Sequence, residues 1–173
     1  MKNFPVIDKV TEREYWISRS VAVVVFVFAK DTHGDTYILA EQRGKGTPDP
    51  EYVGKYCVPC GYLDYDETIV QAAQRELMEE TGLTIPISNF KLVNINDLPK
   101  SDKRQNVTFR YMVNSNVPIE DLSKLFTTKN SEKDEIESIK FIKLKDIDNY
   151  EWAFNHQELI KEISLKKEKA TAL

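Results

Sequence analysis

Three glutamates near the middle of the chain, Glu76, Glu79 and Glu80, have a spacing that places their side chains on one face of a helix. Like charges at this spacing repel each other, and the helix macrodipole disfavours negative charge near a C-terminal end. A bound cation would reverse both effects, and carboxylate oxygens favour hard cations such as Mg²⁺ or Mn²⁺. The three glutamates are therefore candidate metal ligands, and a solvated acidic face is the competing interpretation.

The sequence predicts that these glutamates lie on a well-defined helix over residues 68–80. Thr68 and Gln71 form a capping-box pattern at its start, and Gly82 stands where a C-terminal cap belongs. An apolar stripe along one side of this helix is expected to face the core: Ile69, Ala73 and Leu77.

The glutamates belong to a longer pattern over residues 61–83. Gly61 is followed after five residues by Glu67, and after seven more by the run 75–83, RELMEETGL. This agrees with all nine fixed positions of the Nudix box, G-x5-E-x7-REUxEExGU, where U is a bulky aliphatic residue. The chain thus resembles the Nudix hydrolase family, and the agreement of nine positions within 23 residues makes the resemblance highly specific.

The resemblance implies hydrolysis of a pyrophosphate bond in a small nucleotide-type substrate by metal-assisted attack of water. Mg²⁺ is the implied cofactor, with Mn²⁺ as a substitute. Glu76, Glu79 and Glu80 would hold the cations together with the backbone carbonyl of Gly61, and Glu76 and Glu79 would be catalytic.

Two other residues of the box are expected to be structural. An ion pair between Glu67 and Arg75 would hold the preceding loop against the helix, although Glu67 could instead reach a metal through water. Cys60 and Asp66 stand where glycines are usual in the family. We therefore expect the loop backbone to differ there.

The position of the catalytic base varies in the family, and Glu135 is the candidate in this chain. It lies in an acidic stretch before a predicted strand over residues 139–144, six residues ahead of the aromatic Phe141. A solvent-exposed acidic loop is the competing interpretation.

Arg43, Lys45 and Tyr62 are candidate substrate contacts. Arg43 and Lys45 flank a Gly- and Pro-rich loop over residues 44–56, and their charge complements phosphate. Tyr62 could stack on a base or contact a ribose. Surface solvation is the alternative for the two cations, and ordinary packing is the alternative for the tyrosine.

The identity of the substrate depends on weaker features. Residues 153–156, AFNH, resemble a segment of ADP-ribose-type Nudix proteins, which makes ADP-ribose the leading candidate. A nucleoside triphosphate, a dinucleoside polyphosphate or a capped RNA end stays open. So do a nucleotide-binding sensor without turnover and an isomerase of isoprenoid diphosphates.

The two cysteines, Cys57 and Cys60, form a lone C-x-x-C pattern. A zinc site would need two more ligands, and only His33 and His156 are available. A redox pair of the thioredoxin kind would sit at a helix N-terminus, which this loop lacks. We expect two small, partly buried thiols.

The composition suits one soluble domain over residues 1–173. The net charge of −4 argues against a protein that coats nucleic acid, so no DNA binding is expected. No signal peptide is visible, and the longest apolar run, residues 21–29, is too short to span a bilayer. We therefore expect a cytoplasmic protein without membrane contact, and a homodimer stays open.

Apolar and alternating runs predict the remaining elements of an α/β sandwich, which the resemblance makes a Nudix-type α/β/α sandwich with a mixed β-sheet. The expected hairpin comprises residues 21–29 and 36–43. Further strands are expected over 91–98, 106–114 and 139–144, and further helices over 119–126 and 153–166. The segment 1–17 could be an extra strand or a partner contact.

Overall fold

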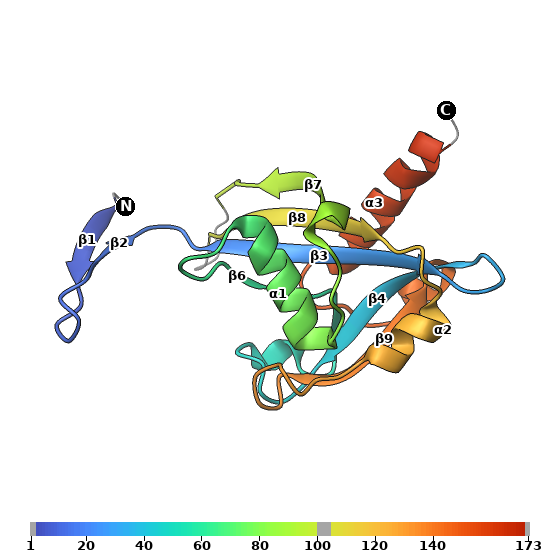
Figure 1. Ribbon diagram of the computed structural model, residues 1–173, viewed down its shortest axis with the longest axis horizontal. Helices are drawn as coiled ribbons and strands as arrows, with labels where there is room; N and C mark the ends of the chain where they lie inside the picture. The colour runs from blue at the N-terminus through green and yellow to red at the C-terminus, as the bar shows by residue number, and fades with distance from the viewer. Residues whose placement is uncertain (1–2, 100–104, 172–173) are drawn as a thin grey trace.

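The computed structural model describes residues 3–99 and 105–171, and within these ranges seven strands form one mixed β-sheet with helices on both faces (Figure 1). The strand order is β5-β4-β3-β8-β7, with β6 also pairing β3 and β9 also pairing β4. The strands of this sheet are β3 (Val21–Lys30), β4 (Thr36–Arg43), β5 (Tyr56–Cys57), β6 (Cys60–Tyr62), β7 (Lys91–Asn96), β8 (Val107–Asn114) and β9 (Ile136–Lys143).

The central strand β3 organises the sheet because both of its faces are apolar. It runs antiparallel to β4, as the expected hairpin requires, and parallel to β8. One set of alternate side chains, which includes Val25, packs in the core beneath helix α1 (Ile69–Thr81). The other set, which includes Phe26, packs in the core beneath helix α3 (His156–Thr171). The predicted α/β/α sandwich is therefore confirmed.

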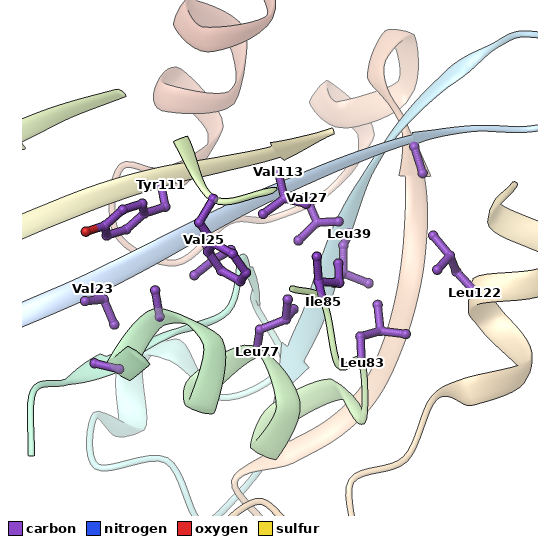
Figure 2. Packing of buried hydrophobic residues seen from close by; sticks show 14 residues of the cluster. Val23, Val25, Val27, Leu39, Leu77, Leu83, Ile85, Tyr111, Val113 and Leu122 are labelled. Atoms are coloured by element: carbon purple, nitrogen blue, oxygen red, sulfur yellow. The ribbon is translucent and has the colours of Figure 1, made fainter. Parts of the chain in front are cut away.

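Helix α1 is defined at both ends by the residues that predicted it. The Thr68 hydroxyl accepts a hydrogen bond from the Gln71 backbone N–H, and the Gln71 side chain accepts one from the Thr68 backbone. Gly82 ends the helix with φ of 81°, a left-handed conformation that glycine adopts without strain. Leu77 is fully buried beneath β3 (Figure 2), so the apolar stripe fixes which face of α1 points outward.

Three elements differ from the expected ranges by three residues or more, and the others by at most two. β9 begins at Ile136 rather than at residue 139, because this buried residue pairs with Arg43 of β4 beyond a bulge at Glu137. The closing helix α3 begins at His156, since the backbone N–H of Ala153 donates to Tyr56 and Phe154 has φ of 56°. The region expected as one helix over 119–126 is the short helix α2 (Ile119–Leu122) followed by a 3-10 turn (Ser123–Leu125).

The N-terminal segment is a separate two-stranded hairpin formed by β1 (Phe4–Ile7) and β2 (Glu14–Ile17) (Figure 1). It contacts the rest of the protein through Tyr15, whose ring packs edge-to-face with the ring of Tyr65. The two ring centroids are 5.5 Å apart. Its apolar side chains are largely in solvent, and Trp16 is 63% exposed. The segment is thus an added sheet outside the main core.

None of the helices in the described part of the chain is long and apolar enough to cross a membrane.

Candidate functional site

One cavity of about 1370 Å³ lies along the outward face of α1 and continues across β6 to β8 and the start of α3. Its carboxylates come from the box helix, from the loop before that helix, from the loop before β9 and from the loop over residues 44–56. The groups discussed below that line it are Arg43, Tyr52, Gly61, Tyr62, Arg75, Glu76, Glu79, Glu80, Asn106, Arg110, Glu135, Phe154 and His156.

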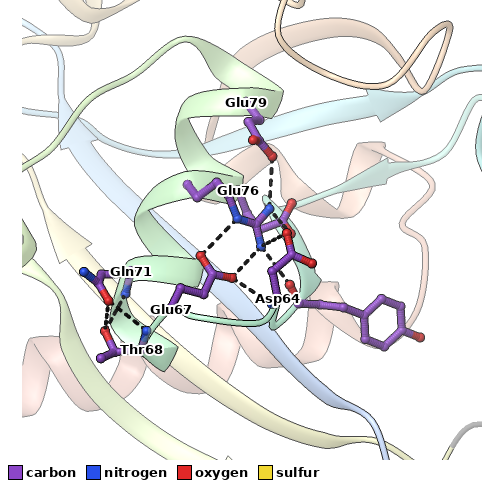
Figure 3. A network of polar contacts seen from close by, with 8 residues as sticks. Asp64, Glu67, Thr68, Gln71, Glu76 and Glu79 are labelled. Carbon is purple, nitrogen blue, oxygen red and sulfur yellow. Dashed lines mark hydrogen bonds and ion pairs between the residues drawn. The ribbon is translucent and has the colours of Figure 1, made fainter. Parts of the chain in front are cut away.

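Arg75 joins the loop before α1 to the helix through hydrogen bonds to three glutamates that Figure 3 labels, Glu67, Glu76 and Glu79. Its guanidinium donates to Glu67 at 2.8 and 3.1 Å, to Glu76 at 2.8 Å and to Glu79 at 3.0 Å. A further hydrogen bond of 2.9 Å reaches the backbone carbonyl of Tyr62. The hydrogen bonds from Arg75 lower the pKa of Glu67, and those to Glu67 raise the pKa of Arg75. This network fixes the loop and also orients two of the three box glutamates.

Gly61 and Glu76 approach each other so closely that a Cβ at residue 61 fits only if the Glu76 carboxyl moves away. A Cβ at Gly61 would lie 2.1 Å from Glu76 Oε1, well inside van der Waals contact. Burial raises the pKa of Glu76 to about 7 although the charge and hydrogen bond of Arg75 lower it, and the charges of Glu79 and Glu135 add smaller increases. The Gly61 backbone and the Glu76 carboxyl therefore share one small region of the cavity wall.

Glu80 points to the other side of the same region and is almost completely buried. It accepts a hydrogen bond of 2.9 Å from the backbone N–H of Cys60. Burial and then the nearby Glu41 carboxyl raise the pKa of Glu80 well above its ordinary value. A bound metal ion would have to offset the free-energy cost of burying the ionised Glu80 carboxylate.

The sequence interpretation missed Glu41, a fully buried carboxyl on β4. Its Oε1 accepts a hydrogen bond from the Cys57 thiol at 3.2 Å, whereas its Oε2 has no hydrogen-bond partner among the described residues. Burial raises the pKa of Glu41 to about 8. The available signal was one acidic residue in the apolar run 37–41, YILAE, two positions after Leu39 and hence on the same buried face.

Glu135 reaches the cavity edge because its loop is fastened to the chain after β4. The backbone N–H of Gly44 donates to the Glu135 carbonyl at 2.6 Å, and that of Gly46 donates to the Asp134 carbonyl at 2.7 Å. The Glu135 carboxylate lies 3.8 Å from the Arg43 guanidinium. Burial raises its pKa. The candidate base thus lies in the same cavity as the box glutamates.

Arg43 and Lys45, expected as phosphate contacts, have different positions. Arg43 lines the cavity but is buried, and it donates to the Thr47 hydroxyl at 2.8 Å and to the Cys57 sulfur at 3.7 Å. Lys45 is exposed and does not line the cavity, so the structure does not bring it to the site. The backbone N–H groups of Gly44 and Gly46, on either side of Lys45, point toward the loop before β9. The Lys45 side chain therefore points into solvent.

Tyr62 lies on the cavity wall with 45% of its surface exposed. Its hydroxyl accepts a hydrogen bond from the Asn106 side chain at 3.3 Å. Two aromatic residues that the sequence interpretation did not select as contacts also line the cavity, and the rings of Tyr52 and Phe154 are 4.5 Å apart. Phe154 has a left-handed backbone, a strain that commonly occurs at functional sites.

The two cysteines are free thiols, Cys57 buried and Cys60 partly buried. His156 is buried too, and its Nδ1 accepts a hydrogen bond of 3.2 Å from the Val58 backbone. Burial, and then the charges of Arg110 and Arg43, lower the pKa of His156 to about 3, so it is neutral at physiological pH. His156 is therefore a core residue that also borders the cavity.

As the side chains stand, no group of three or more His, Cys, Asp or Glu residues in the described ranges is arranged to hold a metal ion. The reason is local, because Glu76 and Glu79 are turned toward Arg75 and Glu80 toward Cys60. The donor set nevertheless suits a hard divalent cation, since it consists of carboxylates beside a backbone carbonyl. The unpartnered oxygen of Glu41 and the raised pKa values of Glu41, Glu76 and Glu80 indicate that Arg43 and Arg75 only partly offset the cost of burying these carboxyls.

The sequence matches the NUDIX domain family over residues 18–163, which is most of the chain and excludes the N-terminal hairpin. The chain therefore belongs to the NUDIX domain family, as residues 61–83 predicted. A search of curated protein sequences found no match.

Solved structures with the same fold support this membership. The NUDIX domain of Shewanella oneidensis NrtR, complexed with ADP ribose, superposes with a TM-score of 0.66 at 20% identity, covering 87% of this chain and 89% of that one. A mutT/nudix family protein from Listeria innocua has a TM-score of 0.60 at 26% identity, with 91% and 100% covered. A bifunctional NMN adenylyltransferase/ADP ribose pyrophosphatase from Francisella tularensis, complexed with AMP and a Mn ion, has a TM-score of 0.63 at 22% identity, with 86% and 42% covered.

Proposed function

We propose that this protein is a cytoplasmic, magnesium-dependent hydrolase that cleaves the pyrophosphate bond of a nucleoside diphosphate linked to another moiety. The observation that carries the proposal is the gathering of the box glutamates in one cavity with the candidate base Glu135, next to the buried carboxyl of Glu41. Such a cluster is costly to bury without a cation, which a family of metal-assisted pyrophosphate hydrolases would supply.

Glu76, Glu79, Glu80 and the Gly61 carbonyl would hold the divalent cation, which when bound neutralises phosphate charge and lowers the pKa of water. To hold the cation, Glu76 and Glu79 would give up their hydrogen bonds with Arg75. Arg75 still holds the loop in place through Glu67. These roles separate the residues that bind the cation from those that position the loop.

Glu135 is the group that would accept the proton of the attacking water. It borders the cavity, and burial raises its pKa toward the operating pH, which improves a carboxylate as a general base. The buried Arg43 lies 3.8 Å away and favours the ionised form that a base requires. The products would be a nucleoside monophosphate and the phosphorylated second moiety.

ADP-ribose is the leading substrate candidate. Residues 153–156, which suggested it, border the cavity at Phe154 and His156. The NrtR domain described above was complexed with ADP ribose, and the Francisella protein is named as an ADP ribose pyrophosphatase. Tyr52 and Phe154 offer ring faces on which a base could stack.

The test is a panel of nucleotides incubated with the purified protein and Mg²⁺, Mn²⁺ or a chelator, with products resolved by chromatography. We expect release of AMP from ADP-ribose with Mg²⁺ and none with the chelator. Glu79→Gln should lower kcat at least about 100-fold, whereas Glu137→Gln, an exposed glutamate outside the cavity, should not change it. Tight binding of ADP-ribose without turnover of any nucleotide would instead establish a sensor.

A further inference from the structure

Arg110, on β8, is the one arginine of the cavity lining that forms no ion pair with the described residues. Arg43 is paired with Glu135, and Arg75 with the box glutamates. Arg110 is only 9% exposed, its Nε–H has no hydrogen-bond partner, and its Nη1 reaches Asn94 at 3.4 Å. A buried guanidinium in this state carries a desolvation cost that an anion would offset.

The groups packed around Arg110 offer no full compensation. Burial lowers its pKa, and Glu162 on α3 acts on it only from a distance. Glu162 is itself exposed and forms an ion pair of 2.6 Å with Lys166. His156, on the same side of the sheet, is neutral. The unmet positive charge therefore faces a cavity that is open to a ligand.

The strand register places Arg110 at a defined distance from the catalytic region. Val24 pairs with Cys60 on one side and with Arg110 on the other, so these three residues lie in a row across the sheet. Two strand spacings separate Cys60 from Arg110, or about 10 Å between Cα atoms. Cys60 and Arg110 lie on the α3 side of the sheet and Glu76 on the α1 side, and all three line one cavity that continues across β6. A ligand bound at Gly61 and Glu76 could therefore reach Arg110 by following that cavity past β6.

A second unpartnered polar atom borders the same part of the cavity. The side-chain oxygen of Asn106 is buried without a hydrogen-bond donor among the described residues. Residues 106, 108 and 110 point to one side of an extended chain, so this acceptor is on the Arg110 side of the sheet. A free donor and a free acceptor together fit a ligand that carries both an anionic group and a hydroxyl group.

We propose that Arg110 forms an anion subsite that binds an additional phosphate or carboxylate of a substrate whose pyrophosphate is cleaved elsewhere in the same cavity. The preferred substrates would then be nucleoside diphosphate compounds that carry an extra acidic group on the nucleoside ribose or on the second moiety. This inference rests on the proposed function, because it assigns a substrate class to the same cavity.

The test uses matched substrate pairs that differ in one charged group. ADP-ribose 2′-phosphate against ADP-ribose places the anion on the nucleoside ribose, and UDP-glucuronate against UDP-glucose places it on the second sugar. For at least one pair, kcat/KM of the wild type should favour the anionic member by at least about tenfold. The pair that shows the preference identifies the source of the anion.

Variants of Arg110 determine whether that preference comes from the subsite. Arg110→Gln should reduce the ratio of kcat/KM between the anionic and the neutral substrate to near one, mainly through a change in KM. It should not lower the melting temperature, since an uncompensated buried charge is removed. Arg110→Lys keeps the charge without the forked donors and should give an intermediate ratio. Arg13→Gln, an exposed arginine on the N-terminal hairpin, is the control and should keep the wild-type ratio.

A binding measurement separates failure of this inference from failure of the proposed function. In chelator, the anionic member of the pair should raise the melting temperature of the wild type more than its neutral partner, and Arg110→Gln should abolish the difference. Absence of hydrolysis with this pattern intact would refute the hydrolase assignment alone. Equal binding of both members, or a preference for the anionic member that survives in Arg110→Gln, would overturn the subsite.

Discussion

Replacing Gly61 by alanine should abolish activity and leave the protein folded. The new Cβ would lie 2.1, 2.2 and 2.5 Å from Oε1, Cδ and Oε2 of Glu76, so the two groups cannot coexist. All three atoms belong to the far end of a flexible side chain, and no backbone atom is among them. The clash is therefore relieved when Glu76 rotates away, which removes a proposed metal ligand.

The structure sets the size of the expected losses of stability and of activity in Gly61→Ala. Moving Glu76 off its preferred rotamer costs about 0.5–1.5 kcal/mol. The contact with Arg75 that would be lost is partly exposed and contributes up to about 1 kcal/mol. A protein of this size should then melt roughly 1–10 °C lower. Displacement of a catalytic group by about 1 Å costs on the order of 100-fold in rate, so kcat should fall by at least that factor.

Two other glycines are matched controls for this measurement. Gly44→Ala places a Cβ 2.3 Å from the backbone oxygen of Asp134, which cannot rotate away, and it should destabilise the protein more than Gly61→Ala does. Gly34→Ala meets nothing within 4 Å but has φ of +90°, so it should cost about 1–2 kcal/mol without affecting kcat. Melting curves and steady-state kcat on the three variants test the reasoning. Wild-type kcat in Gly61→Ala, or a melting temperature as low as that of Gly44→Ala, would refute it.

Other variants probe burial, packing and the loop. Burial raises the pKa of Glu41 from 4.5 to about 8, so the folded state retains a proton and wild-type stability falls as the pH rises between these values. The free energy of unfolding of metal-free Glu41→Gln should therefore rise relative to that of the wild type by up to about 1.4 kcal/mol per pH unit, measured by denaturant titrations from pH 5 to 8. A difference that stays constant over this range would disprove the reasoning. Leu77→Ala should cost about 2–5 kcal/mol in the same assay, because this side chain is fully buried, and a cost below 1 kcal/mol would contradict the packing. Arg75→Gln removes the contact with Glu67 and should increase proteolysis of the loop over residues 61–68, and an unchanged digestion pattern would argue against its structural role.

Features set by neighbouring residues were predictable from the sequence. Thr68, Gln71 and Gly82 determine the ends of α1 through contacts within a few residues. The doubly apolar run of β3 predicted a central strand covered on both faces, and the box predicted the family. These signals are local, so they need no knowledge of how the chain folds back on itself.

Features set by distant residues were not predictable. Glu41 and Arg110 enter the site because of strand pairing with Cys57 and Val24, which lie far from them in the sequence. Lys45 points away because the glycines around it bind the backbone of residues 134–135, about 90 positions further along the chain. A pattern of residue types does not encode such pairings, since the register depends on the whole sheet.

The central claim is that the glutamates of α1 form the catalytic centre, and Glu80→Gln tests it most directly. The amide oxygen of the variant can still accept the hydrogen bond from Cys60, and the carboxyl it replaces has a strongly raised pKa, so the metal-free fold should be retained. With saturating Mg²⁺ and the best substrate of the panel, we predict a kcat at least about 100-fold below that of the wild type, with an unchanged circular dichroism spectrum. A kcat equal to that of the wild type would contradict the account.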